Sequence, residues 1–366
     1  MRCRNALALV GALVLAACSE APIKNAIYAH DQCHRLELVD ERGFSVLGAE
    51  DMVQLPGGDL LVSAYDRRSK TADGTPPEGG IYRVPWQALS EKKLTVSSLI
   101  DTVPGGLRPH GIDAVSLSNK IDVAFVNRGS DETIIVEFQL ENGETSEPQI
   151  YRDEKLCRAN DLFLFSTRQQ KEFLVSIDGK NCGGFASYWE MITNQPTGRL
   201  ETRGTLEEPG LREKVDGVFD EFSFPNGVGI QSWWQAIGHH GSNFFAVAET
   251  RANQIRYLAS QREPVKLPGS PDNITVRPTG IIYAALHPSL MKLALYRYKW
   301  PFFTHAPSRI VKVTGSQMLV LFDDPTGEVF SAASVAVHTG GKLVLGSVGD
   351  KGLLVCSPRD EWGGTS

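Results

Sequence analysis

Short apolar runs separated by turn-forming residues recur along the whole chain and predict a protein built mainly from strands. They lack the period of an amphipathic helix, and each is bounded by Gly, Pro, Asn or Asp. Residues 86–92 are a candidate short helix, and the Pro- and Gly-rich residues 71–80 predict a surface loop. Because the strands never alternate with helices, a single all-β domain is predicted. The runs occupy residues 60–64, 123–126, 134–140, 173–177, 244–248, 281–286, 309–313, 342–346 and 352–355.

The composition fits this prediction and excludes one class of partner. The 366 residues include 35 glycines and 20 prolines, more than a helical protein of this size would tolerate. Hydrophobic residues make up 42% of the chain, enough for a large core. The net charge of -6, without long runs of one sign, gives no reason to expect nucleic acid as a partner.

The first residues have the layout of a bacterial export signal. Two arginines precede an apolar stretch at residues 6–17, too short to span a bilayer, and Leu-Ala-Ala-Cys follows. This ending resembles the lipobox of bacterial lipoproteins. The resemblance implies that residues 1–17 are a signal peptide and that Cys18 carries a lipid. Ser19 then favours the outer membrane, with the protein anchored there and facing the periplasm. An ordinary signal peptide cleaved nearby is the alternative.

Side chains with oxygen or imidazole groups recur in short motifs at quasi-regular intervals. The motifs begin at Glu50, His110, Asn160, Asn226 and Asp272, so the steps between them are 60, 50, 66 and 46 residues. A propeller blade is typically about 40–50 residues, and loop insertions lengthen it. The inner ends of all blades meet at one central channel. The spacing therefore predicts that these side chains converge there.

The cysteines that remain after export suggest how such a ring could be closed. Cys3 leaves with the signal and Cys18 is the lipidation site, which leaves four cysteines for an oxidising compartment. Four cysteines allow three pairings. A bond between the outermost two would tie the first strand to the last, as closing a propeller requires. The four are Cys33, Cys157, Cys182 and Cys356.

Together these motifs resemble the paraoxonase/arylesterase family, which is related to gluconolactonases and strictosidine synthase-like proteins. The resemblance runs from about Cys33 to Cys356 and includes Ala-Ala-Leu-His-Pro at 284–288 and Gly-Leu-Leu-Val-Cys at 352–356. It implies a six-bladed β-propeller with two calcium ions in its central tunnel. The family's terminal disulfide maps onto Cys33 and Cys356, which leaves Cys157 and Cys182 as the remaining pair. The expected domains are a tether at 18–32, the propeller at 33–358 and a tail at 359–366.

The oxygen-bearing residues form a plausible set of ligands for a hard cation. Carboxylate and amide oxygens without sulfur or imidazole suit calcium better than magnesium when five protein ligands are offered. Two carboxylates would balance a divalent charge. By resemblance, this first ion is the catalytic one. Its expected ligands are Glu50, Asn160, Asn226, Asp272 and Asn273.

A second set of ligands lies one residue along the same motifs. Adjacent residues of a strand point in opposite directions, so Glu50-Asp51 and Asn160-Asp161 can each serve two neighbouring ions. The expected ligands of this second ion, structural by resemblance, are Asp51, Asp161 and the backbone carbonyl of Ile112.

The Pro-His-Gly-Ile motif places His110 where the family has a histidine proposed as general base. The family's second histidine aligns with Arg128, which stays protonated and cannot relay a proton. Its positive charge is expected to lower the pKa of His110. Phe224 and His287 match positions that line the substrate pocket. The insertion at 231–242, which contains His239 and His240, is interpreted as a loop.

These residues predict calcium-dependent hydrolysis of a small-molecule carboxylic ester, a lactone or an aryl ester. The cation would polarise the carbonyl group and water would attack its carbon. No Gly-x-Ser-x-Gly motif occurs, which argues against an acyl-serine route. The alternatives are a gluconolactonase-like enzyme for sugar lactones and a non-catalytic calcium-binding propeller of the cell envelope. A strictosidine synthase-like condensation is disfavoured, because that branch lacks the metal constellation.

Overall fold

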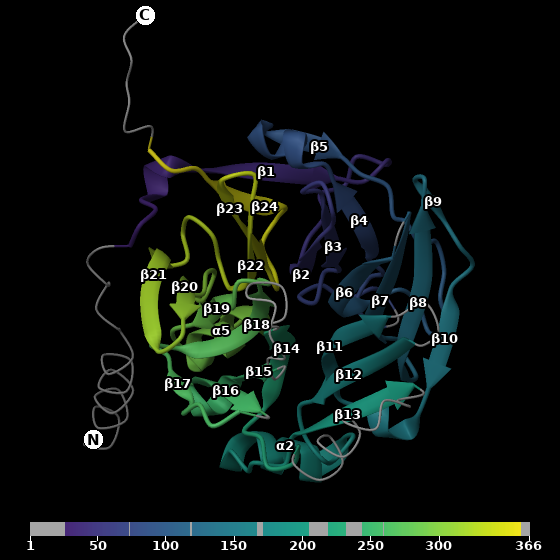
Figure 1. The fold of residues 1–366 in the computed structure, drawn as a ribbon, viewed down its shortest axis with the longest axis vertical. Coiled ribbons are helices and arrows are strands. Elements are labelled where there is room, and N and C mark those ends of the chain that lie inside the picture. Colours follow the sequence, from purple (N-terminus) through teal and green to yellow (C-terminus); the bar gives the residue numbers. More distant parts are fainter. Residues whose placement is uncertain are drawn as a thin grey trace, which may run out of the picture.

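The strands form six sheets that surround a central axis (Figure 1). The computed structural model describes residues 26–359 except 73, 118, 167–170, 205–218, 232–243 and 259. The innermost strand of each sheet contacts the innermost strands of both neighbouring sheets, which closes the sheets into a ring. The chain is therefore a six-bladed β-propeller, and the predicted fold class is confirmed.

In blades 1 to 3 the first three strands pair antiparallel in the order of the sequence. The first strand of each blade lies innermost. Blade 1 comprises β2 (Ala49–Gln54), β3 (Leu60–Ala64) and β4 (Gly80–Val84); blade 2 comprises β6 (Pro109–Leu117), β7 (Lys120–Arg128), β8 (Thr133–Glu141), β9 (Glu144–Thr145) and β10 (Gln149–Arg152); blade 3 comprises β11 (Ala159–Ser166), β12 (Lys171–Ile177) and β13 (Arg199–Gly204).

Blades 4 and 5 repeat this plan, whereas blade 6 takes its outer strand from the other end of the chain. Blade 4 comprises β14 (Pro225–Gln231), β15 (Phe244–Glu249), β16 (Gln254–Leu258) and β17 (Val265–Lys266); blade 5 comprises β18 (Ser270–Val276), β19 (Ile281–His287), β20 (Ser308–Thr314) and β21 (Gln317–Asp324); blade 6 comprises β22 (Ala333–Thr339), β23 (Lys342–Ser347), β24 (Leu353–Cys356) and β1 (Cys33–Val39), with β5 (Lys93–Thr95) parallel to β1.

The middle strands are buried on both faces because each sheet packs between two others. All five residues of β3 are buried, and Val62 of this strand packs in one cluster with Leu36 of β1 and Val337 of β22. A strand buried on both faces has no polar side to alternate with. This explains why the predicted runs are continuously apolar.

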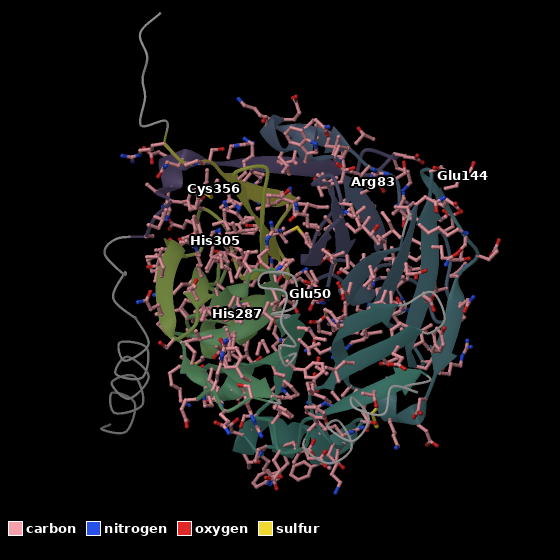
Figure 2. All side chains as sticks on the ribbon, in the orientation of Figure 1. Glu50, Arg83, Glu144, His287, His305 and Cys356 are labelled. Carbon is pink, nitrogen blue, oxygen red and sulfur yellow. A yellow bond between two sulfur atoms is a disulfide. The ribbon has the colours of Figure 1, made fainter. Side chains whose placement is uncertain are left out.

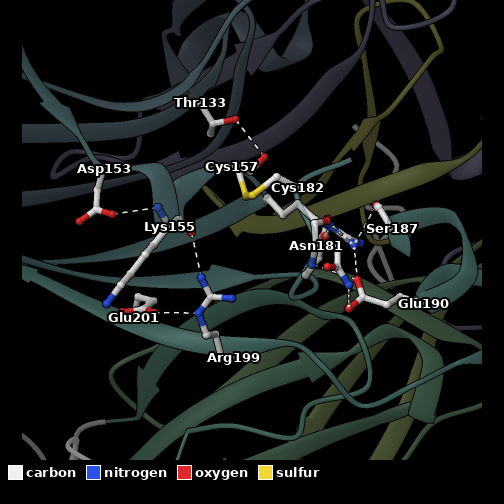
Figure 3. The surroundings of a disulfide bond; sticks show 12 residues. Thr133, Asp153, Lys155, Cys157, Asn181, Cys182, Ser187, Glu190, Arg199 and Glu201 are labelled. Carbon is white, nitrogen blue, oxygen red and sulfur yellow. Dashed lines mark hydrogen bonds and ion pairs between the residues drawn. A yellow bond between two sulfur atoms is a disulfide. The ribbon is translucent and has the colours of Figure 1, made fainter. Parts of the chain in front are cut away.

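Two disulfides fix the ring and one of its loops. Strand β1 pairs with β24 in a register that places Cys33 opposite Cys356, and these two cysteines are bonded. Cys157 and Cys182 form the second bond, between the end of the 3-10 helix η3 (Glu154–Leu156) and the segment before helix α2 (Figure 3). Both predicted pairings are confirmed.

Two short helices occur that the sequence pattern did not predict. Helix α2 (Gly184–Thr193) lies between the second and third strands of blade 3, and α5 (Leu290–Arg297) between those of blade 5. The candidate helix at 86–92 is the 3-10 helix η2 (Trp86–Ser90); the others are η1 (His30–Gln32) and η4 (Thr250–Ala252). In the described ranges, no helix has the length and apolar character needed to cross a bilayer.

Two predictions concern residues outside the described part of the chain. One is the lipidation motif with Cys18, and the other is the insertion beyond residue 231, which includes His239 and His240.

Candidate active site

Every innermost strand has an irregular register at the same level, near its first residues. Such bulges bend a strand and re-aim its side chains. The predicted motifs lie at these irregularities, so their polar side chains are directed around the central axis rather than into the sheets. The shifts lie between Ala49 and Asp51, Pro109 and Ile112, Ala159 and Leu162, Pro225 and Val228, Pro271 and Ile274, and Ala333 and Val335.

A cavity of about 280 Å³ opens above these bulges. Glu50 and His287 lie near the centre of the ring, where the inner strands converge (Figure 2). The structure therefore brings together residues that the sequence separates by more than 200 positions. The predicted site residues that line the cavity are Glu50, His110, Arg128, Asn160, Phe224, Asn226, Asp272 and His287.

Glu50 and His110 belong to a buried assembly of four side chains. Oε2 of Glu50 lies 2.5 Å from a guanidinium nitrogen of Arg67, and Oε1 lies 3.1 Å from Nδ1 of His110. The other ring nitrogen, Nε2, is hydrogen-bonded to the hydroxyl of Tyr65 at 3.2 Å. The Arg67 guanidinium in turn lies 4.3 Å from the centre of the Tyr65 ring. Tyr65 and Arg67 follow β3 in a turn, where the sequence pattern gave no signal.

Charge and burial act differently on the two titrating members of this assembly. Burial alone would raise the pKa of Glu50, but the positive charge of Arg67 and the interaction with His110 lower it to about 2. Burial lowers the pKa of His110 well below its usual value, and the charges of Arg67 and Arg128 lower it further. The contribution of Arg128 has the predicted direction. Burial and Arg67 contribute more.

Arg128 does not take the place of a second histidine against His110. Its Nε donates to the carbonyl oxygen of Ala159 at 2.8 Å, and it forms an ion pair of 3.2 Å with Asp178. Asp178 is shared with Arg158, which also pairs with Glu190 of α2. Arg128 thus ties blade 2 to blade 3 at the wall of the cavity. The hydrogen-bonding partner of His110 is Tyr65.

On the opposite side of the cavity, Asp272 joins two other predicted residues. Its Oδ1 accepts a hydrogen bond from the side-chain amide of Asn226, and its Oδ2 is hydrogen-bonded to Nε2 of His287 at 2.8 Å. Asn273 does not line the cavity, but its amide donates to the backbone carbonyl of Glu50 at 3.0 Å. Ser334 of β22 donates to the same carbonyl at 2.7 Å. The inner strands of blades 4, 5, 6 and 1 are thus linked.

Phe224 closes the wall beside Asn226 with an unusual backbone conformation. Its φ of 61° lies in the left-handed region, which is uncommon for an aromatic residue. The following Pro225 begins β14, and the carbonyl of Phe224 accepts a hydrogen bond from the amide of Thr250. Backbone strain of this kind is typical of residues held at a functional site.

Three buried amide oxygens in the centre lack a hydrogen-bond donor. They are Oδ1 of Asn160, Asn226 and Asn273, and none has a partner among the described residues. An unsatisfied buried acceptor costs roughly 1–3 kcal/mol, which a bound cation would offset. The carboxylates of Glu50 and Asp272 lie among them. Within the described ranges no three His, Cys, Asp or Glu side chains form a metal-binding group, so amide oxygens are an essential part of any such site.

The second members of the motifs line a separate, smaller cavity of about 90 Å³. Asp51, Asp113 and Asp161 each accept one amide from the next residue and one from the neighbouring blade, at 2.8–2.9 Å. Ile112 reaches this cluster through its N–H, which donates to Asp51. The sequence prediction did not include Asp113, because it follows Gly111 and Ile112 and so does not stand in an acid–acid or amide–acid pair like Glu50-Asp51 and Asn160-Asp161.

Burial destabilises the charged forms of these carboxyl groups, and neighbouring carboxylates add to the effect at Asp51 and Asp161. Burial raises the pKa of Asp113 to about 7. Burial also raises the pKa of Asp161, and the charges of Asp51 and Asp113 raise it further. Gly111 allows Asp161 to approach, since a Cβ at this position would lie 2.1 Å from its Oδ1.

Comparison with known proteins identifies the family. A family model described as arylesterase matches residues 48–357. A search of curated proteins found no match. Among solved structures, a proposed gluconolactonase is 13% identical, with a TM-score of 0.49 over 89% of this chain and 92% of that one. The soluble aldose sugar dehydrogenase of Escherichia coli is also 13% identical, with a TM-score of 0.48 over 86% and 97%. Because the family model covers most of the sequence, the chain belongs to the arylesterase family.

Proposed function

We propose that this protein is a calcium-dependent hydrolase of carboxylic esters, a lactonase or arylesterase. The observation that carries the proposal is the group of three buried amide oxygens without hydrogen-bond donors near two carboxylates: those of Asn160 and Asn226 line the cavity, and that of Asn273 belongs to the residue after Asp272. Membership of the arylesterase family supports a hydrolase. The calcium requirement and the substrate are the parts proposed here.

The type and the number of oxygen ligands in the central group of residues suit calcium. Glu50, Asn160, Asn226, Asp272 and Asn273 would hold the catalytic ion, because oxygen ligands of mixed charge suit a hard cation with flexible coordination. When bound there, calcium would act as a Lewis acid toward the substrate carbonyl and the negative charge that develops on its oxygen.

The second cluster would hold the structural ion. Asp51 and Asp161 are the proposed side-chain ligands, together with the carbonyl of Ile112. The raised pKa of Asp161 supports this assignment, because a divalent cation would relieve the repulsion between neighbouring carboxylates.

His110 is the proposed general base. Nδ1 lies 3.1 Å from Oε1 of Glu50, and the lowered pKa of Glu50 keeps that carboxylate charged, so the proton of the neutral ring is held on Nδ1. Nε2 then accepts a hydrogen bond from the Tyr65 hydroxyl and is the nitrogen proposed to take a proton from water. The lowered pKa keeps the ring neutral near pH 7. Water attacks the carbonyl carbon once this proton is removed.

The apolar wall of the cavity favours a lactone or aryl ester over a sugar lactone. Leu290, Leu293 and Ala294 of α5 face the cavity from its rim. Such a surface suits an alkyl or aryl group of the substrate. A gluconolactonase-like activity remains the second candidate, since the same oxygen ligands would serve it.

A substrate panel with controlled metal content tests the proposal. The purified protein is treated with a chelator and then assayed with aliphatic lactones, sugar lactones and phenyl esters. Turnover should be lost on chelation and restored by calcium but not by magnesium. Equal turnover before and after chelation would remove the calcium requirement. Calcium binding without turnover of any panel member would favour the non-catalytic envelope propeller.

We also propose that the protein is lipid-anchored through Cys18, facing the periplasm from the outer membrane. The motif at residues 15–18 and the acquisition of two disulfides, which suits an oxidising compartment, support this. Palmitate labelling of the wild type but not of Cys18→Ala, followed by membrane fractionation, tests the proposal. Equal labelling of both would refute it.

A further inference from the structure

The walls of the large cavity carry more positive than negative charge. Four arginines and three acidic residues line it, although the whole chain has a net charge of -6. Two of the acids, Glu50 and Asp272, are the proposed ligands of a divalent cation. With that cation bound, the positive excess of the cavity would increase further. The arginines are Arg67, Arg128, Arg251 and Arg297.

The four arginines differ in how well they are partnered. Arg128 is satisfied by Asp178 and a backbone carbonyl, and Arg67 pairs with Glu50. In the described part of the chain, Arg251 and Arg297 have no carboxylate within ion-pair distance. Burial lowers the pKa of Arg251, and no acidic group opposes this effect. By contrast, the fully buried Arg309 pairs with Asp323.

The two unpaired arginines line the same cavity as the proposed catalytic residues. Arg251 belongs to η4, directly after Thr250, whose hydroxyl donates to the carbonyl of Pro271. Arg297 is the last residue of α5, the helix that supplies the apolar wall. A substrate that fills the cavity would therefore meet an oxygen-rich floor, an apolar wall and two free guanidinium groups. Guanidinium groups prefer carboxylates, which they bind through paired hydrogen bonds.

We infer that the substrate carries an anionic group, such as a carboxylate, in addition to the ester that is cleaved, and that Arg251 and Arg297 bind it. This inference rests on the proposed ester hydrolysis and specifies the substrate class. The two arginines determine specificity; they do not contact the reacting carbonyl. Their positive field also draws anionic substrates into the cavity, an effect that salt screens.

A pair of phenyl esters that differ in one charge tests the inference. The monophenyl ester of glutaric acid carries a carboxylate, and phenyl valerate has a methyl group in its place. For the wild type, kcat/KM should favour the anionic ester by about tenfold, the value expected for a hydrogen bond to a charged group. High salt should reduce this ratio. In the double variant Arg251→Gln/Arg297→Gln the ratio should fall toward one.

The matched control is Arg128→Gln, since Arg128 also lines the cavity but has its own partners. Its effect on turnover should be similar for both esters, so their ratio should stay within about twofold of the wild-type value. A wild-type ratio of one or less, or a ratio that the double variant leaves unchanged, would overturn the inference.

A binding measurement separates this inference from the proposed function. Calorimetric titration with glutarate needs no turnover, and the double variant should bind it about tenfold more weakly than the wild type. If neither phenyl ester is cleaved but this difference is found, ester hydrolysis is wrong and the anion site stands. Equal glutarate affinity of wild type and double variant would refute the anion site whatever the enzyme hydrolyses.

Discussion

The two cavities on the propeller axis use neighbouring residues of the same motifs in opposite ways. At the large cavity, Glu50 and Asn160 surround a centre in which amide oxygens lack donors. At the small cavity, Asp51 and Asp161 accept a backbone amide at each carboxylate oxygen. One step along the strand therefore separates an unsatisfied polar group from a satisfied one.

This difference indicates that the large cavity is a binding site, whereas the carboxylates of the small cavity link neighbouring blades. A carboxylate that accepts an amide from the next blade holds the two blades together, as Asp161 does with Val228. An amide oxygen that is buried without a donor costs stability and is retained where a ligand satisfies it. Substitutions at the small cavity should therefore affect mainly stability, and those at the large cavity mainly activity.

The largest effect is expected for Asp161→Ala at the small cavity. The substitution leaves the amides of Leu162 and Val228 without their acceptor, at a cost of about 1–3 kcal/mol each. Denaturant unfolding, with and without calcium, measures the loss. Asp153→Ala is the control: Asp153 accepts the amide of Lys155 at the surface, where loss of a cap costs about 1 kcal/mol. A loss no larger than that of the control would contradict the structural role.

The opposite pattern is expected for Asn226→Ala at the large cavity. It removes a buried oxygen that lacks a donor, which favours stability, and also the hydrogen bond that Asn226 donates to Asp272, which opposes it, so the net change in stability should be smaller than for Asp161→Ala, while the proposed catalytic ion loses a ligand. Turnover should fall roughly 100-fold, the scale seen when one group that stabilises developing charge is removed. Rates of ester hydrolysis test the expected loss of turnover, and thermal unfolding of the same preparation tests the expected small change in stability. Full turnover with lowered stability would show that Asn226 has a structural role, like the residues of the small cavity, and not a catalytic one.

Sequence reasoning predicted the propeller and the residues at its axis because both depend on local motifs repeated once per blade. It missed Tyr65 and Arg67 because these follow β3 in a turn, and only the three-dimensional arrangement brings them to Glu50 and His110. The short helices α2 and α5 were missed for a related reason. With ten and eight residues, each spans too few turns for a helical period to stand out between strands.

Removal of a disulfide should lower the stability of the whole propeller and so affect both cavities alike. The Cys33–Cys356 bond spans 323 residues and the Cys157–Cys182 bond spans 25. On the chain-entropy model, the longer loop gives about 2 kcal/mol more stabilisation. Cys33→Ala/Cys356→Ala should therefore unfold at lower denaturant concentration than Cys157→Ala/Cys182→Ala. Equal losses would show that ring closure owes little to this bond, and a selective loss of turnover would place the bond in the site.

The smallest effect is expected for Tyr65→Phe, which decides how His110 is held. Phenylalanine keeps the ring that lies against Arg67 and removes only the hydroxyl bonded to Nε2. Without that partner Nε2, the nitrogen proposed to accept a proton from water, is no longer held in place, so kcat should fall about tenfold with little change in KM. Nitrogen chemical shifts of His110 should report the loss of the hydrogen bond at Nε2. Tyr82→Phe, in an apolar cluster of blade 1, is the control and should retain full turnover.

Arg128→Gln should reduce kcat less than Tyr65→Phe, because Arg128 bonds Ala159 and Asp178 rather than the imidazole. The reverse order would assign the partner of His110 to Arg128, the residue at the family's second histidine position.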